Sequence, residues 1–391
     1  MTAAVPAVPG KVKALSLVSL FNDFASEMVY PLLPAFVVGT LGGGALALGA
    51  LDGAADLTSA ALKVASGRLA DRPRWRRPLI LLGYATAVLV RPLISATAAA
   101  WQVVALRVVD RAGKGIRTPA RDALIAALTP QAQRGRAFGF HRGADHFGAV
   151  LGSLAAWYFL TAGAEVRSVI AWSIVPGVVA FVILAAVLRD DSERPAAATV
   201  LPQGDAVGRV FWAPVGALAA LALFRLPEAL LILRLQDLGV GVATVPLVWA
   251  GLHVVRSGSS YPGGWLSDHL GPRNTIAAGG ALFAGVAASL ARDLSAGLAI
   301  AAFLLLGLVA GLTESAERAL VARLAPVRTG RGFGVYHALI GLMALPAGLL
   351  FGALYQEWGG GRALAASAGG VVLATAVWLA AAPRRGQGEQ S

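Results

Sequence analysis

The sequence predicts an all-α membrane protein with twelve transmembrane helices in two pseudo-symmetric six-helix bundles. Composition, the placement of charge and an internal repeat each support this fold class. The chain has 391 residues, of which 57% are hydrophobic and 14% charged, and its mean hydropathy is +0.69. A soluble globular domain is about 45–50% apolar and about a quarter charged. The composition therefore excludes an ordinary soluble domain.

Twelve apolar segments are long enough to cross a bilayer, which takes about 20 residues. In chain order they are residues 14–39, 45–70, 78–98, 100–127, 136–162, 166–189, 211–236, 242–266, 274–292, 295–322, 331–357 and 361–382. The charged, Pro-containing stretch between the sixth and seventh segments separates two halves. We therefore expect an N-terminal bundle over 1–189, a cytoplasmic linker over 190–210 and a C-terminal bundle over 211–391.

The net charge of +12 is concentrated on alternate loops. Basic residues fill 71–78, 189–194 and 323–331, whereas the intervening loops 39–44 and 95–101 carry none. This is the positive-inside bias of a multispanning protein, and it places both termini in the cytoplasm. The same bias explains the basic composition without nucleic-acid binding. The chain has no Cys, which excludes disulfides and thiolate metal sites.

The two halves repeat each other in sequence. "GRLADRPRWR" (67–76) matches "GWLSDHLGPR" (264–273), with an Arg five residues after the Asp. "RDALIAALTPQAQRGRAFGFH" (121–141) matches "ERALVARLAPVRTGRGFGVYH" (317–337) with one residue deleted. Because the matching segments occur in the same order, we expect a parallel six-plus-six repeat about an axis along the membrane normal.

Twelve spans, a central linker and the doubled G-x-L-x-D-…-R loop resemble the major facilitator superfamily. The stretch "DRAGKGIR…PARDALIA" within 110–126 also resembles a bacterial subgroup of that superfamily, usually regarded as efflux proteins. The resemblance implies a monomeric alternating-access carrier of a small-molecule substrate in a bacterial-type inner membrane. It implies no cofactor and no enzymatic activity.

In the family, the loops after spans two and eight clamp the cytoplasmic side shut. The carboxylates there are expected to meet helix N-termini and arginines, while the glycines let helices approach closely. The alternative is that these charges only set the topology. The first copy departs from the pattern, because Arg74 stands where a Gly is usual. The expected gate residues are Gly67, Asp71, Arg72, Arg76, Gly264, Asp268 and Arg273.

Span four carries an unusual row of charges, in "LRVVDRAGKGIRTPARDAL" (106–124). Residues three and four apart lie on one helical face, and an ionised side chain facing lipid costs several kcal/mol. We therefore expect this row to line a water-filled cavity or to meet countercharges from neighbouring spans. The expected cavity residues are Asn22, Tyr30, Arg107, Asp110, Arg111, Lys114, Arg117, Arg142, Arg225, Glu228, Glu314, Glu317 and Arg318.

Proton coupling needs a carboxylate that is neutral in one conformation and charged in the other. Asp23 and Glu27 lie one turn apart in span one, whose membrane-spanning part carries no cation to hold them ionised. Asp145 with His141 in span five is a further candidate pair. The expected coupling residues are Asp23, Glu27, Asp145 and His141.

The excess of arginines favours an organic anion or zwitterion as substrate, since Arg binds carboxylate and phosphate through paired hydrogen bonds. No phosphate-binding G-x-x-x-x-G-K-[ST] loop is present, which argues against ATP-driven transport. No metal site is expected. The sequence therefore predicts proton-coupled efflux of a small organic solute. Proton-coupled import of an anionic metabolite and a non-transporting membrane sensor are the alternatives.

Overall fold

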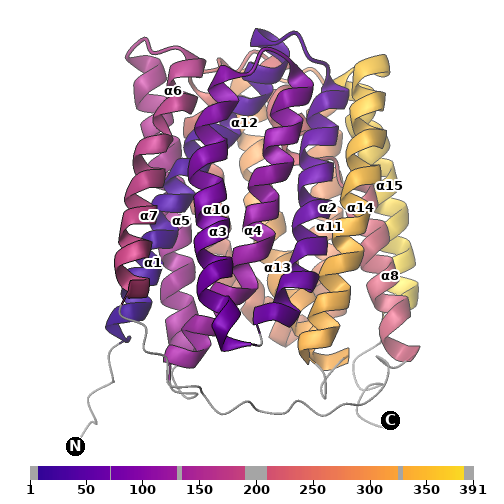
Figure 1. The fold of residues 1–391 in the computed structure, drawn as a ribbon. Coiled ribbons are helices and arrows are strands. Elements are labelled where there is room, and N and C mark those ends of the chain that lie inside the picture. Colours follow the sequence, from indigo (N-terminus) through magenta and orange to yellow (C-terminus); the bar gives the residue numbers. More distant parts are fainter. Residues whose placement is uncertain (1–7, 71, 130–133, 190–208, 325–328, 383–391) are drawn as a thin grey trace, which may run out of the picture.

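The computed structural model describes residues 8–70, 72–129, 134–189, 209–324 and 329–382, and within these ranges all regular structure is helical. Figure 1 shows the long helices side by side, running roughly parallel from one end of the molecule to the other. The helices are α1 (Gly10–Val29), α2 (Ala45–Ala70), α3 (Pro73–Leu93), α4 (Ala100–Leu128), α5 (Arg134–Thr161), α6 (Val166–Trp172), α7 (Ile174–Arg189), α8 (Arg209–Phe224), α9 (Glu228–Asp237), α10 (Val245–Leu270), α11 (Pro272–Leu290), α12 (Ala296–Leu304), α13 (Leu306–Leu324), α14 (Thr329–Trp358) and α15 (Gly360–Ala381).

Three of the predicted spans are each built from two helices. The sixth is α6 with α7, the seventh α8 with α9 and the tenth α12 with α13. The seventh is interrupted at residues 225–227, where Pro227 lacks the N–H that a continuous helix needs. The first span continues beyond α1 through two short turns, Tyr30–Leu32 and Ala35–Thr40. Joined in this way, the described helices form the twelve predicted membrane-length segments.

Seven of these segments satisfy length and hydropathy criteria for membrane spans by composition alone. The segment formed by α4 is not among them, because its row of ionisable residues lowers its hydropathy. Its membrane location follows from its neighbours, since it packs along both α2 and α3.

The internal repeat is visible in the packing. In the first half α2 packs on α4, α3 on α7 and α1 on α5; the equivalent pairs of the second half are α10 on α13, α11 on α15 and α8 on α14. Each half therefore builds its own helical bundle from matching pairs of helices.

The two halves meet where α2 packs on α14 and α5 packs on α10. Small residues bring α2 and α14 together: a Cβ on Gly49 would lie 1.9 Å from the carbonyl oxygen of Gly348, and one on Gly53 would lie 2.7 Å from that of Ala344. These contacts lie in the part of α2 nearest its start at Ala45, the end that the charge bias assigns to the outside. Small residues allow such close helix contact.

Toward the other end of α2, the last glycine contact between the halves is at Ala60. A Cβ added to Gly341 of α14 would lie 2.2 Å from the Cβ of Ala60. A Cβ on Gly67 would meet only Pro119 of α4 in its own half, and one on Gly334 would meet nothing within 4 Å. Val64 of α2 is exposed. The halves are thus closed at the end predicted to be outside, an inward-facing arrangement in that topology.

Candidate functional site

A buried ionic cluster joins α3, α4 and α1. Asp110 accepts from Arg91 Nε at 2.9 Å and from Arg107 Nη1 at 3.4 Å, and all three side chains are at most 4% exposed. Arg91 Nη1 also donates to the backbone oxygen of Asn22 at 2.7 Å and to its Oδ1 at 3.1 Å. The Arg107 guanidinium lies 4.8 Å from the centre of the Tyr30 ring, and its Nε and Nη2 have no hydrogen-bond partner in the described chain. One carboxylate thus holds two buried cations.

Arg117 lies on the same side of α4 as Asp110 and is also buried. Its Nη1 donates to the carbonyl of Gly83 at 3.1 Å, and its guanidinium stacks 4.6 Å from the ring of Tyr84. Asp110 and Arg117 were expected to line a cavity, whereas the structure places both between α4 and α3. This placement favours a role in fixing the helices over contact with a substrate.

A second set of cations on α2, α4 and α5 has no such partners. Lys63, Arg111, Lys114 and Arg142 make no side-chain hydrogen bond and no ion pair with any other described residue. They lie within electrostatic range of one another, since Lys63 interacts with Arg111 and Arg142, and Lys114 interacts with Arg111 and Lys63. Arg142 is exposed and the other three are partly exposed. We call these four residues the cation cluster.

Two of the predicted coupling acids lie beside the cation cluster. Asp23 accepts from Asn22 Nδ2 at 2.9 Å and interacts electrostatically with Lys114 and Asp145. Asp145 Oδ1 lies 3.8 Å from His141 Nε2 on the preceding turn of α5. The acids of spans one and five therefore lie within electrostatic range of each other, and their role in proton coupling stays a prediction.

Glu27 instead reaches the other half of the molecule. Its Oε2 accepts from Trp249 Nε1 at 2.8 Å and lies 3.8 Å from His253 Nε2, both on α10. Neither ring nitrogen of His253 has a hydrogen bond in the described part of the chain, and the residue is 9% exposed. Glu27 therefore connects α1 to α10 in this arrangement, in which the halves are closed at the end near Ala45.

A second carboxylate, that of Asp52, bridges the halves closer to the predicted outside than Glu27 does. Asp52 Oδ2 of α2 accepts from the Tyr30 hydroxyl at 3.0 Å and from the backbone N–H of Ala229 at 3.0 Å. Ala229 lies in the first turn of α9, where backbone N–H groups lack partners within the helix. Asp52 thus caps a helix of the opposite half.

Two of the ion pairs in the second half contain the predicted cavity residues Arg225 and Glu228. Arg225 Nη1, at the break between α8 and α9, lies 4.0 Å from Glu317 Oε1, and Glu317 also accepts from the Tyr336 hydroxyl. Glu228 Oε1 pairs at 2.7 Å with Arg256 of α10. Arg225 and Glu317 were both predicted cavity residues, and the structure places them together.

The remaining predicted pair, Glu314 and Arg318, is 3.3 Å apart, and both side chains are about half exposed. His337 of α14 interacts electrostatically with Arg318 and also with Lys63 and Arg142 of the first half. Exposed ionisable side chains of both halves therefore lie within electrostatic range of one another at the end of the molecule beyond Ala60 of α2.

The expected gate is only partly described. Asp71 lies outside the described residues. Arg76 Nε donates to the carbonyl of Ala70 at 2.9 Å, and Arg273 donates to the carbonyl of Leu379 on α15. These two arginines thus fix the ends of neighbouring helices, and their pairing with gate carboxylates stays a prediction.

The other gate residues lie at the same end of the molecule. Arg72 and Asp268 are exposed. A Cβ on Gly67 would lie 4.0 Å from Pro119, and one on Gly264 would lie 3.9 Å from Ser315, so each glycine faces a helix of its own half. The two copies occupy equivalent places, as the sequence repeat predicts.

Comparison with known families identifies this architecture. The model described as "Major Facilitator Superfamily" matches residues 15–252, more than half of the chain. The chain belongs to this superfamily. This facilitator is therefore a multi-pass membrane transporter with a small-molecule substrate.

Relatives and solved structures agree with the assignment. An uncharacterized MFS-type transporter of Methanocaldococcus jannaschii is 28% identical to this facilitator over 355 residues, covering 88% of this chain and 87% of the relative. A bacterial homologue of the human lysosomal transporter Spinster, inward-facing and unoccupied, superposes with a TM-score of 0.71 at 15% identity, covering 95% and 96% of the two chains. A POT family transporter in complex with 5-aminolevulinic acid has a TM-score of 0.77 at 10% identity, covering 95% and 96%. These two likenesses show the facilitator fold.

Sequence reasoning missed several residues that this facilitator places at its centre. Arg91 binds Asp110, and Trp249 and His253 hold Glu27. A signal existed for the last two, because a Trp and a His four residues apart lie on one face of a helix. Arg91 gave a different signal, because it is the one cation in the predicted third membrane span, 78–98.

Proposed function

We propose that this chain is a secondary active transporter that exports a small organic anion or zwitterion by alternating access, in exchange for protons. The single observation that carries the proposal is the cation cluster. Four cations on three neighbouring helices have no ion-pair partner among the described residues and lie within electrostatic range of one another.

Such a cluster is costly inside a membrane protein unless something neutralises it. Five acids lie within its electrostatic range, and none approaches it within ion-pair distance: Asp23, Glu27, Asp56, Asp110 and Asp122. An anionic substrate supplies the missing charge. Arg111 and Arg142 bind a carboxylate or phosphate through paired hydrogen bonds, while the lysines act as point charges.

Coupling to protons follows from Glu27. When ionised, it accepts from Trp249 and lies beside His253, so it holds the end of the molecule near Ala45 closed. Protonation removes the charge that attracts these groups and releases the contact. An empty, ionised carrier then stays inward-facing, whereas either a bound proton or a bound substrate lets the halves rock, as exchange requires. Asp23, and Asp145 with His141, lie beside the cation cluster and are the alternative coupling sites.

Export is supported by the resemblance of "DRAGKGIR…PARDALIA" to efflux proteins. In this proposal a monomer sits in a bacterial-type inner membrane with both termini in the cytoplasm. The bundles 1–189 and 211–391, which the linker 190–210 connects in sequence, rock against each other. Import of an anionic metabolite uses the same residues with the opposite net flux.

A ligand screen on the purified protein tests the proposed substrate class. Small organic anions and zwitterions are expected to raise the midpoint of thermal unfolding, and organic cations to leave it unchanged, because binding stabilises the folded state by mass action. Arg111→Gln is expected to weaken the binding of an active anion by about 10- to 100-fold, since hydrogen bonds to charged groups contribute about 1.5–3 kcal/mol.

Arg77→Gln is the matched control, because Arg77 is exposed at the start of α3. Its response to each anion should equal that of the wild type. Stabilisation by organic cations alone, or an equal loss in both variants, would contradict the proposal. Flux into inside-out vesicles driven by an acidic interior then separates export from import.

A further inference from the structure

A pocket that the transport mechanism does not use lies at the closed end of the second half. It has a volume of about 670 Å³ and lies between the end of α11 and the start of α15, beside the end of α9. Arg234, Arg292, Asp293, Trp358 and Arg362 line its polar part. Three cations against one acid give it a net positive charge.

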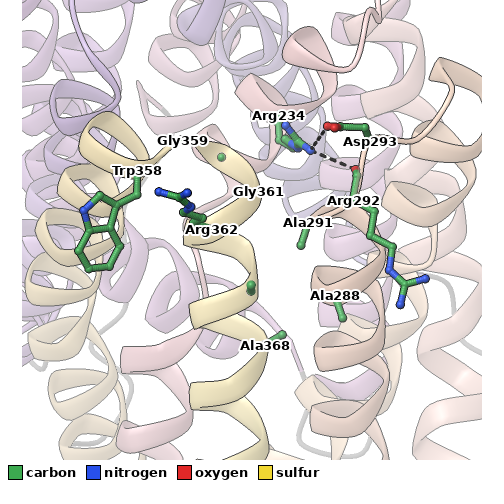
Figure 2. A pocket seen from close by; sticks show the side chains of 12 residues that line it. Arg234, Ala288, Ala291, Arg292, Asp293, Trp358, Gly359, Gly361, Arg362 and Ala368 are labelled. Atoms are coloured by element: carbon green, nitrogen blue, oxygen red, sulfur yellow. Dashed lines mark hydrogen bonds and ion pairs between the residues drawn. The ribbon is translucent and has the colours of Figure 1, made fainter.

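The polar end of this pocket is built by a buried arginine. Arg234 is 7% exposed, and its guanidinium binds the carbonyls of Leu290 and Arg292 at 2.9 and 3.0 Å and Asp293 Oδ1 at 3.3 Å. It thereby fixes the turn that carries Arg292 (Figure 2). The arginine side of the pocket is therefore held in a defined shape.

Glycines bring the opposite wall close. Gly359 has a φ of +84°, a backbone conformation that favours glycine. A Cβ on Gly361 would lie 2.7 Å from the carbonyl oxygen of Ala291, so only glycine lets α15 start this near α11. Figure 2 shows Arg362 and Arg292 on opposite sides of the pocket, with the guanidinium of Arg362 directed toward Trp358 and that of Arg292 directed away from Arg362.

Arg292 and Arg362 make no hydrogen bond or ion pair from their side chains with other described residues, and each is at least partly exposed. They also oppose the charge bias of the chain, since they lie at the end that the basic loops assign to the outside. The positive-inside bias therefore does not explain Arg292 and Arg362. The cation cluster does not include them, because it lies toward the opposite end of the molecule.

The rest of the pocket is apolar and continues into the membrane-facing surface. Ala288, Ala291, Ala365 and Ala368 line it below the arginines. Beyond them the exposed face of α15 runs on through Val372 and Leu373, of which Leu373 is 68% exposed. Cations above an apolar groove match the shape of an amphiphile with an anionic head.

We propose that this pocket binds an anionic phospholipid, with its phosphate at the arginine end, within reach of the exposed side chains of Arg292 and Arg362, and an acyl chain along the alanines of α11 and α15. Trp358, which is 58% exposed, flanks the head at the depth where aromatic side chains prefer the membrane interface. The lipid holds α15 against α11 and so stabilises the second bundle.

The test measures lipid binding to the purified, delipidated full-length chain. Phosphatidylglycerol in mixed micelles should raise the unfolding midpoint and remain bound in native mass spectrometry, whereas phosphatidylcholine should do neither. Arg292→Gln and Arg362→Gln should each raise the half-saturating fraction of phosphatidylglycerol about fivefold, since a basic residue near an anionic surface contributes about 1 kcal/mol. Arg292→Lys and Arg362→Lys should keep most of the effect.

Arg77→Gln at the opposite end serves as the control and should bind the lipid as the wild type does. Glycerol phosphate and inorganic phosphate are tested alone as the soluble sources of the same chemistry. Equal phosphatidylglycerol binding in wild type and both glutamine variants would overturn the proposal, and so would full stabilisation by either soluble phosphate.

Discussion

Replacing Asp110 with alanine is expected to destabilise the folded protein by about 3–5 kcal/mol. The mutation leaves Arg91 and Arg107 buried without the carboxylate that both contact. Removing one partner of a buried ion pair costs more than the pair contributes, because an uncompensated charge stays behind. Reversible unfolding in mixed detergent micelles measures the loss.

The matched control is Asp122→Ala. Asp122 is also on α4 and also pairs with an arginine, Arg121, at 3.0 Å, but its side chain is 40% exposed. We expect a loss of about 0–1 kcal/mol there, as for other solvent-exposed pairs. A double-mutant cycle of Arg91→Gln with Asp110→Asn should give a coupling energy of about 1–3 kcal/mol. Equal, small losses for both aspartates would mean that the cluster does not hold α3 to α4.

Replacing Glu27 with glutamine is expected to uncouple transport from the proton gradient. Glutamine keeps the size of the side chain but cannot titrate, so the contact with Trp249 and His253 no longer depends on the protonation of residue 27. In proteoliposomes, accumulation against a gradient should fall by about 5- to 150-fold, the range of typical coupling energies of about 1–3 kcal/mol. Exchange of labelled for unlabelled substrate at equal pH should persist.

Asp23→Asn is the matched comparison, one turn away on the same helix. Asp23 has a hydrogen bond from Asn22 but accepts none from the opposite half among the described residues. We expect it to change substrate affinity more than coupling. The reverse pattern, with coupling lost in Asp23→Asn and kept in Glu27→Gln, would transfer the proton-coupling role to Asp23. Trp249→Phe, which removes the indole N–H donor but keeps an aromatic ring, should uncouple partially.

Much of the fold could be predicted because membrane spans are a local property of sequence. Apolar length identified the spans, and the repeated motifs predicted matching helix pairs in the two halves. The break at residues 225–227 was missed, although Pro227 in the middle of the span was a visible reason for it.

The site was harder to predict, because helical periodicity gives the face of a residue but not the neighbour on that face. Asp110 and Arg117 are seven residues apart and share a face, about 60–80° around the helix from Arg107. That face meets α3, which sequence alone does not reveal. Glu27 and His253 lie in different halves of the chain, so their meeting depends on how the two halves pack.

The central claim is that ionised Glu27 holds the two halves together at the end near Ala45, and that a proton releases them. The chain has no Cys, so spin labels at Thr40 and Val242, both exposed at that end on different halves, report one distance without background. Pulsed electron–electron double resonance in nanodiscs measures the distance between the two labels as a function of pH. We predict a short distance at high pH that gives way to a longer one as the pH falls, and a Glu27→Gln variant that populates the longer distance at every pH. A distance that does not change with pH, or a pH response unchanged in Glu27→Gln, would contradict the account.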